Sequence, residues 1–229
     1  MRYYEIIKQL GLEPWWGEFL RSNPSNTLPY HNFLHTTFMI EDAFEGAMAE
    51  GLTPVIDHPV MKALILAAMY HDWGHTGGVF NLDPERVKAG EVKASPDSVN
   101  IRLAVEKVKG MLKLGFWPCG VSLDQVINNI KATQFPYDIP AEDLTPSGRI
   151  LRDADILTSC RDSKVFQCLF GLSRELGVPM DLWPELNKRF VLSIEQSTEW
   201  GKRRWAAALP QILEEYDAFI QAWNIGYSD

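Results

Sequence analysis

Residues 60–75 read VMKALILAAMYHDWGH, an apolar run that ends in two histidines and an aspartate. Apolar residues cover nearly every side of the helix that this run would form, which predicts a helix at the centre of a core. Pro59 stands where a first-turn proline is favoured, and Asp57 is the predicted N-cap. Gly74 predicts the end of the helix. Three side chains of the kinds that bind metals therefore fall at the end of the most apolar helix.

Helical periodicity also describes the rest of the chain. We expect helices at about 2–22 (two short ones), 30–50, 95–114, 122–133, 149–170 and 180–224 (two, divided near Gly201 or Pro210). Residues 79–95 and 134–148 carry few periodic apolar positions and are predicted to be connecting segments. The sequence has no run of alternating polar and apolar residues and no internal repeat. The predicted fold is all-α, a single compact domain over residues 1–229, with residues 1–25 as an N-terminal helical extension.

The composition narrows the classes of partner. A chain of 229 residues with 46% hydrophobic residues can bury a full core, and its net charge of -8 comes without a basic block, which argues against binding long nucleic acids. Cys119, Cys160 and Cys168 form no CxxC pair, so we expect reduced thiols. The run from Val60 to Tyr70 is too short to span a membrane, and the N-terminus lacks a long apolar segment. We expect a soluble cytoplasmic protein without membrane partners.

Four of the five histidines fall into two pairs. His31 and His35 are four apart in a predicted helix that begins at Tyr30, so their imidazoles share one face. His71 and His75 flank the turn that ends the apolar helix. One such pair alone is more often a helix start and a core histidine than a functional site. The two pairs together indicate a site.

Two aspartates complete a mixed set of nitrogen and oxygen ligands. Asp72 adjoins His71, and Asp155 lies near the beginning of a later helix. Histidines and carboxylates together suit zinc, manganese or iron, and the carboxylates also suit magnesium. Asp153 is two residues from Asp155, so both cannot face the same ion on a regular helix. The residues indicate a divalent-metal site that excludes Asp153.

These residues stand in an order that resembles a known family. His35, then His71-Asp72, then Asp155 is similar to the H…HD…D pattern of the HD superfamily of metal-dependent phosphohydrolases. The stretch YHNFLH at 30–35 resembles the Y-H-N-x-x-H motif of class I cyclic-nucleotide phosphodiesterases, and 67–75 resembles their A-A-x-x-H-D-x-D-H run. Within the superfamily the likeness is closest to the catalytic domain of these phosphodiesterases. Gly74 replaces the second aspartate of that run, so the resemblance supports phosphohydrolase chemistry better than it supports a cyclic-nucleotide substrate.

The resemblance implies an HD-type helical domain with two divalent metal ions, which could be zinc, manganese, magnesium or iron. The residues that would hold the first ion are His35, His71, Asp72 and Asp155. Asp72 would bridge to a second ion held mainly by water, and water between the two ions would attack phosphorus. His31 would protonate the leaving oxygen as general acid, with His75 supporting the water or the phosphate.

The implied substrate is a phosphate ester of a nucleotide or related small molecule, including the cyclic-nucleotide type. Asn81 and Lys131 are candidate phosphate contacts, and Gln196 is the candidate for the glutamine that holds the purine in the phosphodiesterases. Two alternatives stay open: an HD-fold oxygenase that activates dioxygen with two irons, and a non-catalytic sensor of a nucleotide or a metal. The sequence indicates neither the native metals nor the oligomeric state.

Overall fold

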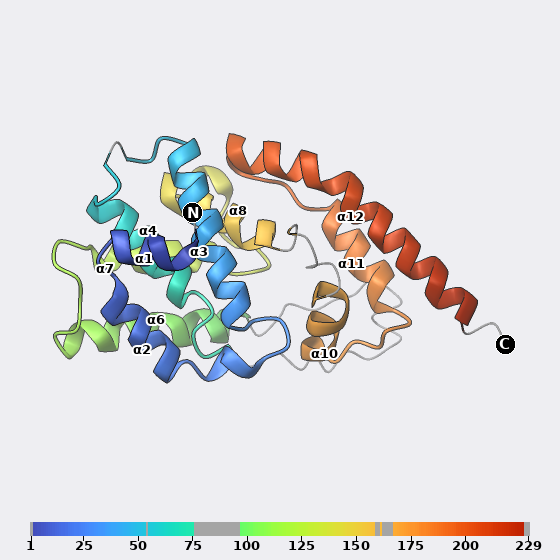
Figure 1. The fold of residues 1–229 in the computed structure, drawn as a ribbon, viewed down its shortest axis with the longest axis horizontal. Coiled ribbons are helices and arrows are strands. Elements are labelled where there is room, and N and C mark those ends of the chain that lie inside the picture. The colour runs from blue at the N-terminus through green and yellow to red at the C-terminus, as the bar shows by residue number, and fades with distance from the viewer. Residues whose placement is uncertain (1, 54, 76–96, 159–160, 162–166, 227–229) are drawn as a thin grey trace.

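The structure is a computed structural model that describes residues 2–53, 55–75, 97–158, 161 and 167–226 (Figure 1). Within these ranges the chain forms helices and no strands, which confirms the all-α prediction. No helix in the described part of the chain combines the length and the apolar character needed to cross a membrane.

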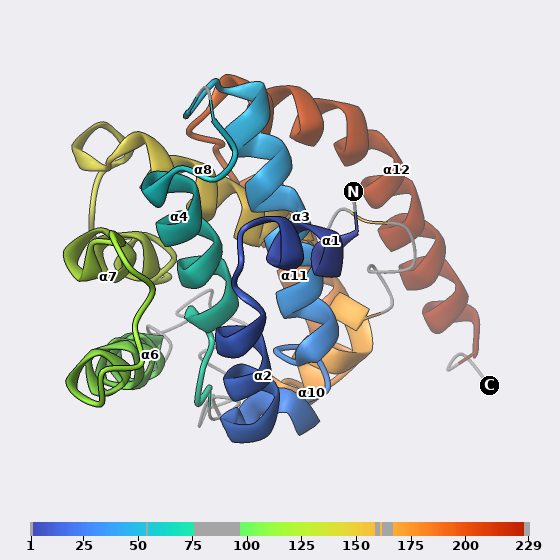
Figure 2. The same cartoon turned by 60° about the vertical axis from the view of Figure 1, so that its left-hand side comes forward.

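Helix α4 (Pro59–Tyr70) is the centre of the core, as the apolar run predicts. Every residue from Ala63 to Tyr70 is buried. It packs against α3 (Phe33–Ala49), α7 (Leu123–Ala132) and α8 (Pro146–Leu157), and Figure 2 shows it between α7 and α3. Burying one large aliphatic side chain contributes about 1.5–3 kcal/mol, so this helix supplies much of the stabilising contact area. The end of α4 is therefore held in place by the core, and so is the start of the segment that follows it.

The cap of α4 differs from the prediction. His58 rather than Asp57 is the N-cap, and its Nδ1 accepts a hydrogen bond from the Val60 backbone N–H at 3.2 Å. Asp57 instead forms an ion pair with Lys62 at 2.6 Å. A neutral imidazole nitrogen can accept the bond that a carboxylate would otherwise accept, and the ion pair engages the Asp57 side chain.

The two predicted N-terminal helices are confirmed as α1 (Tyr3–Gln9) and α2 (Glu13–Ser22), followed by the 3₁₀ turn η1 (Pro24–Thr27). Leu12, Trp16 and Phe19 are buried in the same hydrophobic core as α4. The Tyr70 hydroxyl donates to the Trp15 carbonyl at 2.8 Å, which ties α2 to the end of α4. The first helices therefore pack into the same core as α4. That the chain is a single domain with residues 1–25 as an extension stays a prediction.

The predicted helix over 149–170 is wrong at both ends. Helix α8 begins earlier, because the Thr145 hydroxyl caps it by accepting the Gly148 N–H at 3.1 Å and Pro146 occupies its first turn. It ends at Leu157, with Thr158 as C-cap. Leu169 and Phe170 of the predicted helix belong to the π-helix η4 (Gln167–Leu172), which is followed by α10 (Ser173–Leu176), and residues 162–166 lie outside the described residues. Apolar periodicity alone did not reveal that α8 ends before η4.

The helices toward the C-terminus are divided at a different place from the one predicted. They are α11 (Trp183–Leu192) and α12 (Glu199–Gly226), so Gly201 and Pro210 both lie inside α12. Asp153 of α8 accepts the Thr198 backbone N–H at 2.7 Å and thereby caps α12 from a distant part of the chain. A Cβ at Gly201 would collide with that carboxylate, so the glycine permits close approach rather than ending the helix. In both views α12 forms one edge of the molecule (Figures 1 and 2).

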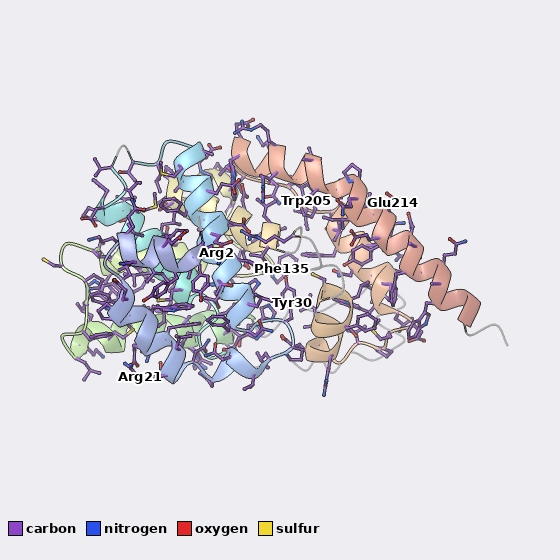
Figure 3. The ribbon with its side chains drawn as sticks, viewed as in Figure 1. Arg2, Arg21, Tyr30, Phe135, Trp205 and Glu214 are labelled. Carbon is purple, nitrogen blue, oxygen red and sulfur yellow. The ribbon has the colours of Figure 1, made fainter. Side chains whose placement is uncertain are left out.

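The remaining described elements are α6 (Asp97–Lys113) and η2 (Ala141–Asp143). The start of α6 predicted at Ser95 lies outside the described residues, and its end agrees with the prediction. Side chains fill the space between the helices, and Tyr30, labelled in Figure 3, lies between the beginning of α3 and α10. This arrangement directs the beginning of α3 and the ends of α4 and α8 toward one region.

Candidate metal centre

Four side chains from three helix ends converge on one point. They are His35 from the first turn of α3, His71 and Asp72 from the turn after α4, and Asp155 from the last turn of α8. The Nε2 atom of His35 lies 3.2 Å from His71 Nε2, from Asp72 Oδ2 and from Asp155 Oδ1. Ligand atoms that surround one divalent ion at about 2.1 Å lie roughly 3 to 3.5 Å apart. The spacing is that of a ligand set.

The other ring nitrogens show which atoms could bind a cation. His71 Nδ1 lies 2.9 Å from the Ala68 carbonyl, which can only accept, so this nitrogen carries a proton. His35 Nδ1 lies 3.2 Å from the Thr158 hydroxyl, whose own proton bonds the Asp155 carbonyl at 2.7 Å. Nδ1 is therefore a donor in both rings, and both Nε2 atoms face the shared point, where a cation could take the place of any proton on them.

The two aspartates give a second reason to expect a cation at this point. Asp72 Oδ2 is buried and lies 3.2 Å from His35 Nε2 and 3.0 Å from His71 Nε2. A buried carboxylate without a positive partner costs more than the roughly 1–3 kcal/mol of a neutral polar group, so it needs a protonated imidazole or a metal ion beside it. Two imidazole nitrogens and two carboxylate oxygens also form the mixed set that borderline divalent metals bind. The four residues therefore fit a divalent metal ion.

Electrostatics keep these carboxylates charged. Burial alone would raise the pKa of Asp72, but the positive charges of His71 and His31 hold it well below its usual range. The pKa of Asp155 is lowered to about 2, because hydrogen bonds from His35 and His71 outweigh burial. Burial opposes a charge on His71, yet Asp72 and Asp155 raise the pKa of that imidazole well above its ordinary value. A metal ion would thus replace a proton on His71 Nε2.

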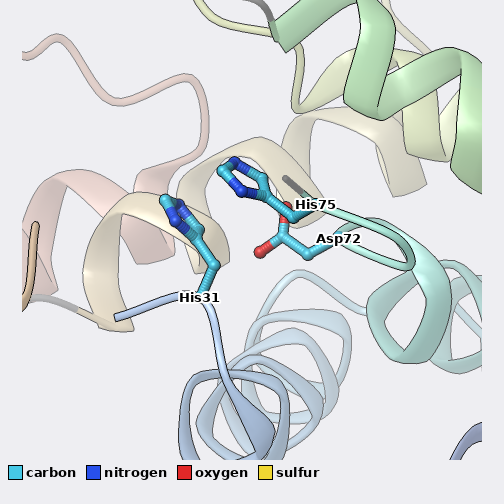
Figure 4. Close-up of side chains that lie close together, drawn as sticks. All are labelled: His31, Asp72 and His75. Carbon is cyan, nitrogen blue, oxygen red and sulfur yellow. The ribbon is translucent and has the colours of Figure 1, made fainter. Parts of the chain in front are cut away.

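A second cluster adjoins the first across Asp72. His31 and His75 stack with ring centroids 3.9 Å apart and planes inclined by 19° (Figure 4). One nitrogen of each ring and an oxygen of Asp72 lie within 4.8 Å of one another. His31 stands before Asn32, the N-cap of α3, so the prediction that it shares a helical face with His35 is wrong. The bend before the helix nevertheless brings its ring to the site.

The partner of His31 is Glu175, a residue that the sequence reasoning missed. His31 Nδ1 donates to Glu175 Oε2 at 2.6 Å, and the His31 backbone N–H donates to Oε1 at 2.8 Å. The Tyr30 backbone N–H bonds the same oxygen, and Glu175 is buried. These contacts join α10 to the beginning of α3 across 144 residues. No local pattern around Glu175 marks it, because its partner lies so far away in the sequence.

The two stacked imidazoles differ in charge. Burial lowers the pKa of His31, but the carboxylates of Asp72 and Glu175 raise it above its ordinary value. Burial and the charge of His31 lower the pKa of His75 to about 3. Of the two rings, His31 therefore binds a proton more readily, and His75 is neutral at neutral pH. The cluster can donate a proton beside the point at which the four ligand atoms meet.

A loop after α2 holds the turn that carries the ligands. Asn23 Oδ1 accepts the Gly74 backbone N–H at 3.1 Å and the Ser25 backbone N–H at 3.1 Å. The Ser25 hydroxyl lies 2.9 Å from the Asp72 carbonyl. Gly74 has a φ of 78°, a left-handed conformation that glycine adopts without the penalty of a Cβ. These contacts, which we call the Asn23–Ser25 clasp, fix the backbone on both sides of residue 73.

Of the three predicted substrate contacts, the structure describes Lys131 and Gln196, and no described contact joins either to this cluster. Asn81 lies outside the described residues. Lys131 is exposed in the last turn of α7. Gln196 is buried before α12, where its Oε1 is close to Gly201 and Asp153. As predicted, Asp153 does not face the ion site, because it is the cap of α12.

The site consists of two adjoining parts, a set of four candidate ligand atoms and an imidazole held by Glu175. Together they could bind a divalent ion and deliver a proton next to it. Comparison with known proteins does not assign a family, because the chain matches no protein-family model and no curated protein.

Proposed function

We propose that the protein is a cytoplasmic metal-dependent phosphohydrolase of the HD type, which hydrolyses a phosphate ester of a nucleotide or related small molecule. The observation that supports this most strongly is the convergence of His35, His71, Asp72 and Asp155 with both Nε2 atoms turned inward. The neighbouring His31 supplies the acid that an alkoxide leaving group needs.

Divalent ions, two of zinc, manganese, magnesium or iron, would bind at the four ligand residues, with Asp72 shared between them, and when bound would supply Lewis acidity and an activated water. Side chains of the protein would exclude water and supply further positive charge. Burial of His35 and His71 excludes bulk water from the ligand side. The protonated His31 adds positive charge next to an anionic substrate, which the overall charge of -8 would otherwise repel.

His31 is the general acid in this proposal. Glu175 holds its Nδ1 proton, which leaves the proton on Nε2 to be transferred to the leaving oxygen. Glu175 also stabilises the charged ring before transfer and fixes its direction through two backbone N–H groups. The neutral His75 stacked on it keeps one face of the ring in place. Positioned proton transfer of this kind contributes about 10²–10⁴-fold to a rate.

A substrate and metal screen tests the proposal. The chain is stripped of metal with a chelator and reloaded with manganese, magnesium, zinc or iron. It is then assayed with cyclic nucleotides, nucleoside monophosphates and a generic phosphodiester, with and without oxygen. We expect hydrolysis that depends on metal and not on oxygen. Oxygen-dependent turnover with tightly bound iron would instead establish the oxygenase alternative.

A pair of histidine variants separates catalysis from sensing. His31→Asn should lose turnover and keep its metal, because the ring is the acid and none of the four ligands. His58→Asn is the matched control, since His58 is an exposed N-cap outside the site and asparagine caps helices well. Retention of full function by His31→Asn would favour a non-catalytic metal or nucleotide sensor.

A further inference from the structure

One buried hydroxyl contacts two of the four ligand residues. Thr158, the C-cap of α8, is fully buried. Its Oγ1 lies 3.2 Å from His35 Nδ1 and 2.7 Å from the Asp155 carbonyl. The hydroxyl therefore joins the ligand from α3 to the ligand from α8.

The donor in each hydrogen bond of the Thr158 hydroxyl follows from the number of protons that each group carries. A threonine hydroxyl has one proton, and a backbone carbonyl can only accept. The bond to the Asp155 carbonyl uses the Thr158 proton, so the oxygen accepts from His35. A neutral imidazole has one N–H, and a proton on Nδ1 leaves Nε2 free as a ligand atom.

We propose that Thr158 is a positioning residue that selects the Nδ1–H tautomer of His35 and thereby sets the affinity of the centre for metal. The inference rests on the metal centre of the proposed function. Thr158 touches neither the ion nor the substrate and acts through His35. Because the position is fully buried, bulk water has no ready access to replace the lost hydroxyl.

The chain contains a closely matched control in Thr133. Thr133 is the C-cap of α7, is buried, and donates its hydroxyl to the carbonyl three residues earlier, Ile130, at 2.8 Å. Thr158 makes the same bond to Asp155. The Thr158 hydroxyl contacts a histidine, whereas the bond described for the Thr133 hydroxyl is to a backbone carbonyl. A Thr→Val change at 133 therefore measures the cost of losing a buried capping hydroxyl without the histidine.

The first measurement is the affinity of the full chain for zinc alone and for manganese alone. We expect Thr158→Val to weaken binding by about 10- to 100-fold, the usual effect of losing a group that orients a ligand. Thr158→Ser keeps the hydroxyl and should restore binding to within about threefold of the wild type. Thr133→Val should leave it unchanged. Equal affinities in Thr158→Val and Thr133→Val would overturn the proposal.

The second measurement needs no variant to fold and no metal to bind. Ring ¹H–¹⁵N spectra of the metal-free wild-type chain, at a pH where His35 is neutral, should show the proton on Nδ1. A proton on Nε2 would overturn the proposal. If the wild type binds neither ion while His35 has its proton on Nδ1, the proposed function fails and the role of Thr158 as tautomer anchor stands.

Discussion

The two clusters that meet at Asp72 are built in different ways. The ligand set comes from helix ends, and the second nitrogen of each ligand histidine has a helical partner, the Ala68 carbonyl of α4 for His71 and the Thr158 hydroxyl at the end of α8 for His35. The pair His31 and His75 lies outside the helices and depends on Glu175, which is 144 residues from His31. The difference indicates that metal binding and proton donation can be lost separately. Metal binding should be lost when the helical core is changed, and proton donation should be lost when the contact between His31 and Glu175 is changed.

The largest effect is expected where the two clusters share a residue. Asp72→Ala removes the buried oxygen that faces both His35 and His71 and also the charge that helps to keep His31 protonated. We expect loss of metal by more than about 100-fold in affinity and no detectable turnover. Metal analysis of the purified variant measures this. Asp57→Ala, an exposed aspartate before α4, is the control, and equal metal content in both variants would refute the ligand assignment.

A smaller effect, confined to the second cluster, is expected from Glu175→Gln. The amide keeps the size of the side chain but removes the charge that raises the pKa of His31. We expect kcat to fall by about 10²- to 10³-fold while the metal content stays the same. Glu185→Gln, at an exposed position in the first turn of α11, is the control. A variant that loses metal together with activity would show that the two clusters are not separable.

Metal affinity should depend on pH through the first cluster. The pKa of His71 is raised well above its ordinary value, so its Nε2 carries a proton at neutral pH, and an ion must displace that proton. Affinity should therefore fall as the pH falls, by about tenfold per unit while one proton is displaced. Calorimetry in two buffers of different ionisation enthalpy counts the released protons. An affinity independent of pH between 5 and 8, roughly the range in which histidines titrate, would contradict this account.

The smallest effect concerns the turn between the clusters. Gly74→Ala places a Cβ on a residue with a φ of 78°, at a cost of about 1–2 kcal/mol in the free energy of unfolding. Space does not add to the cost, because the new Cβ would lie 3.5 Å from Leu103. Gly110→Ala, inside α6 and free of neighbours within 4 Å, should instead stabilise by about 0.5–1 kcal/mol. Denaturant unfolding compares the two, and equal effects would exclude backbone strain at Gly74.

The comparison also explains what the sequence could predict. Periodicity identified α4, and the order of His35, His71, Asp72 and Asp155 indicated a set that the structure does bring together. Their role as metal ligands stays a proposal. Spacing along a helix is a local property, so it is visible in the sequence.

What could not be predicted depends on contacts between distant segments. Glu175 and Thr158 have no motif of their own, because their partners lie 144 and 123 residues away. The end of α8 was missed for a related reason, since apolar residues continue beyond it into η4. Gly201 was misread as a break, although it accommodates the carboxylate of Asp153. A residue type such as glycine can therefore have different roles, depending on which distant segments pack against it.

The Asn23–Ser25 clasp bears on where the chain can be divided. A fragment that begins at residue 26 would contain all four ligands, His31, His75 and Glu175. It would nevertheless lack the acceptor for the Gly74 N–H and the hydroxyl beside the Asp72 carbonyl. We therefore predict that the smallest fragment that keeps the site intact begins at or before Asn23, inside the segment predicted to be an N-terminal extension.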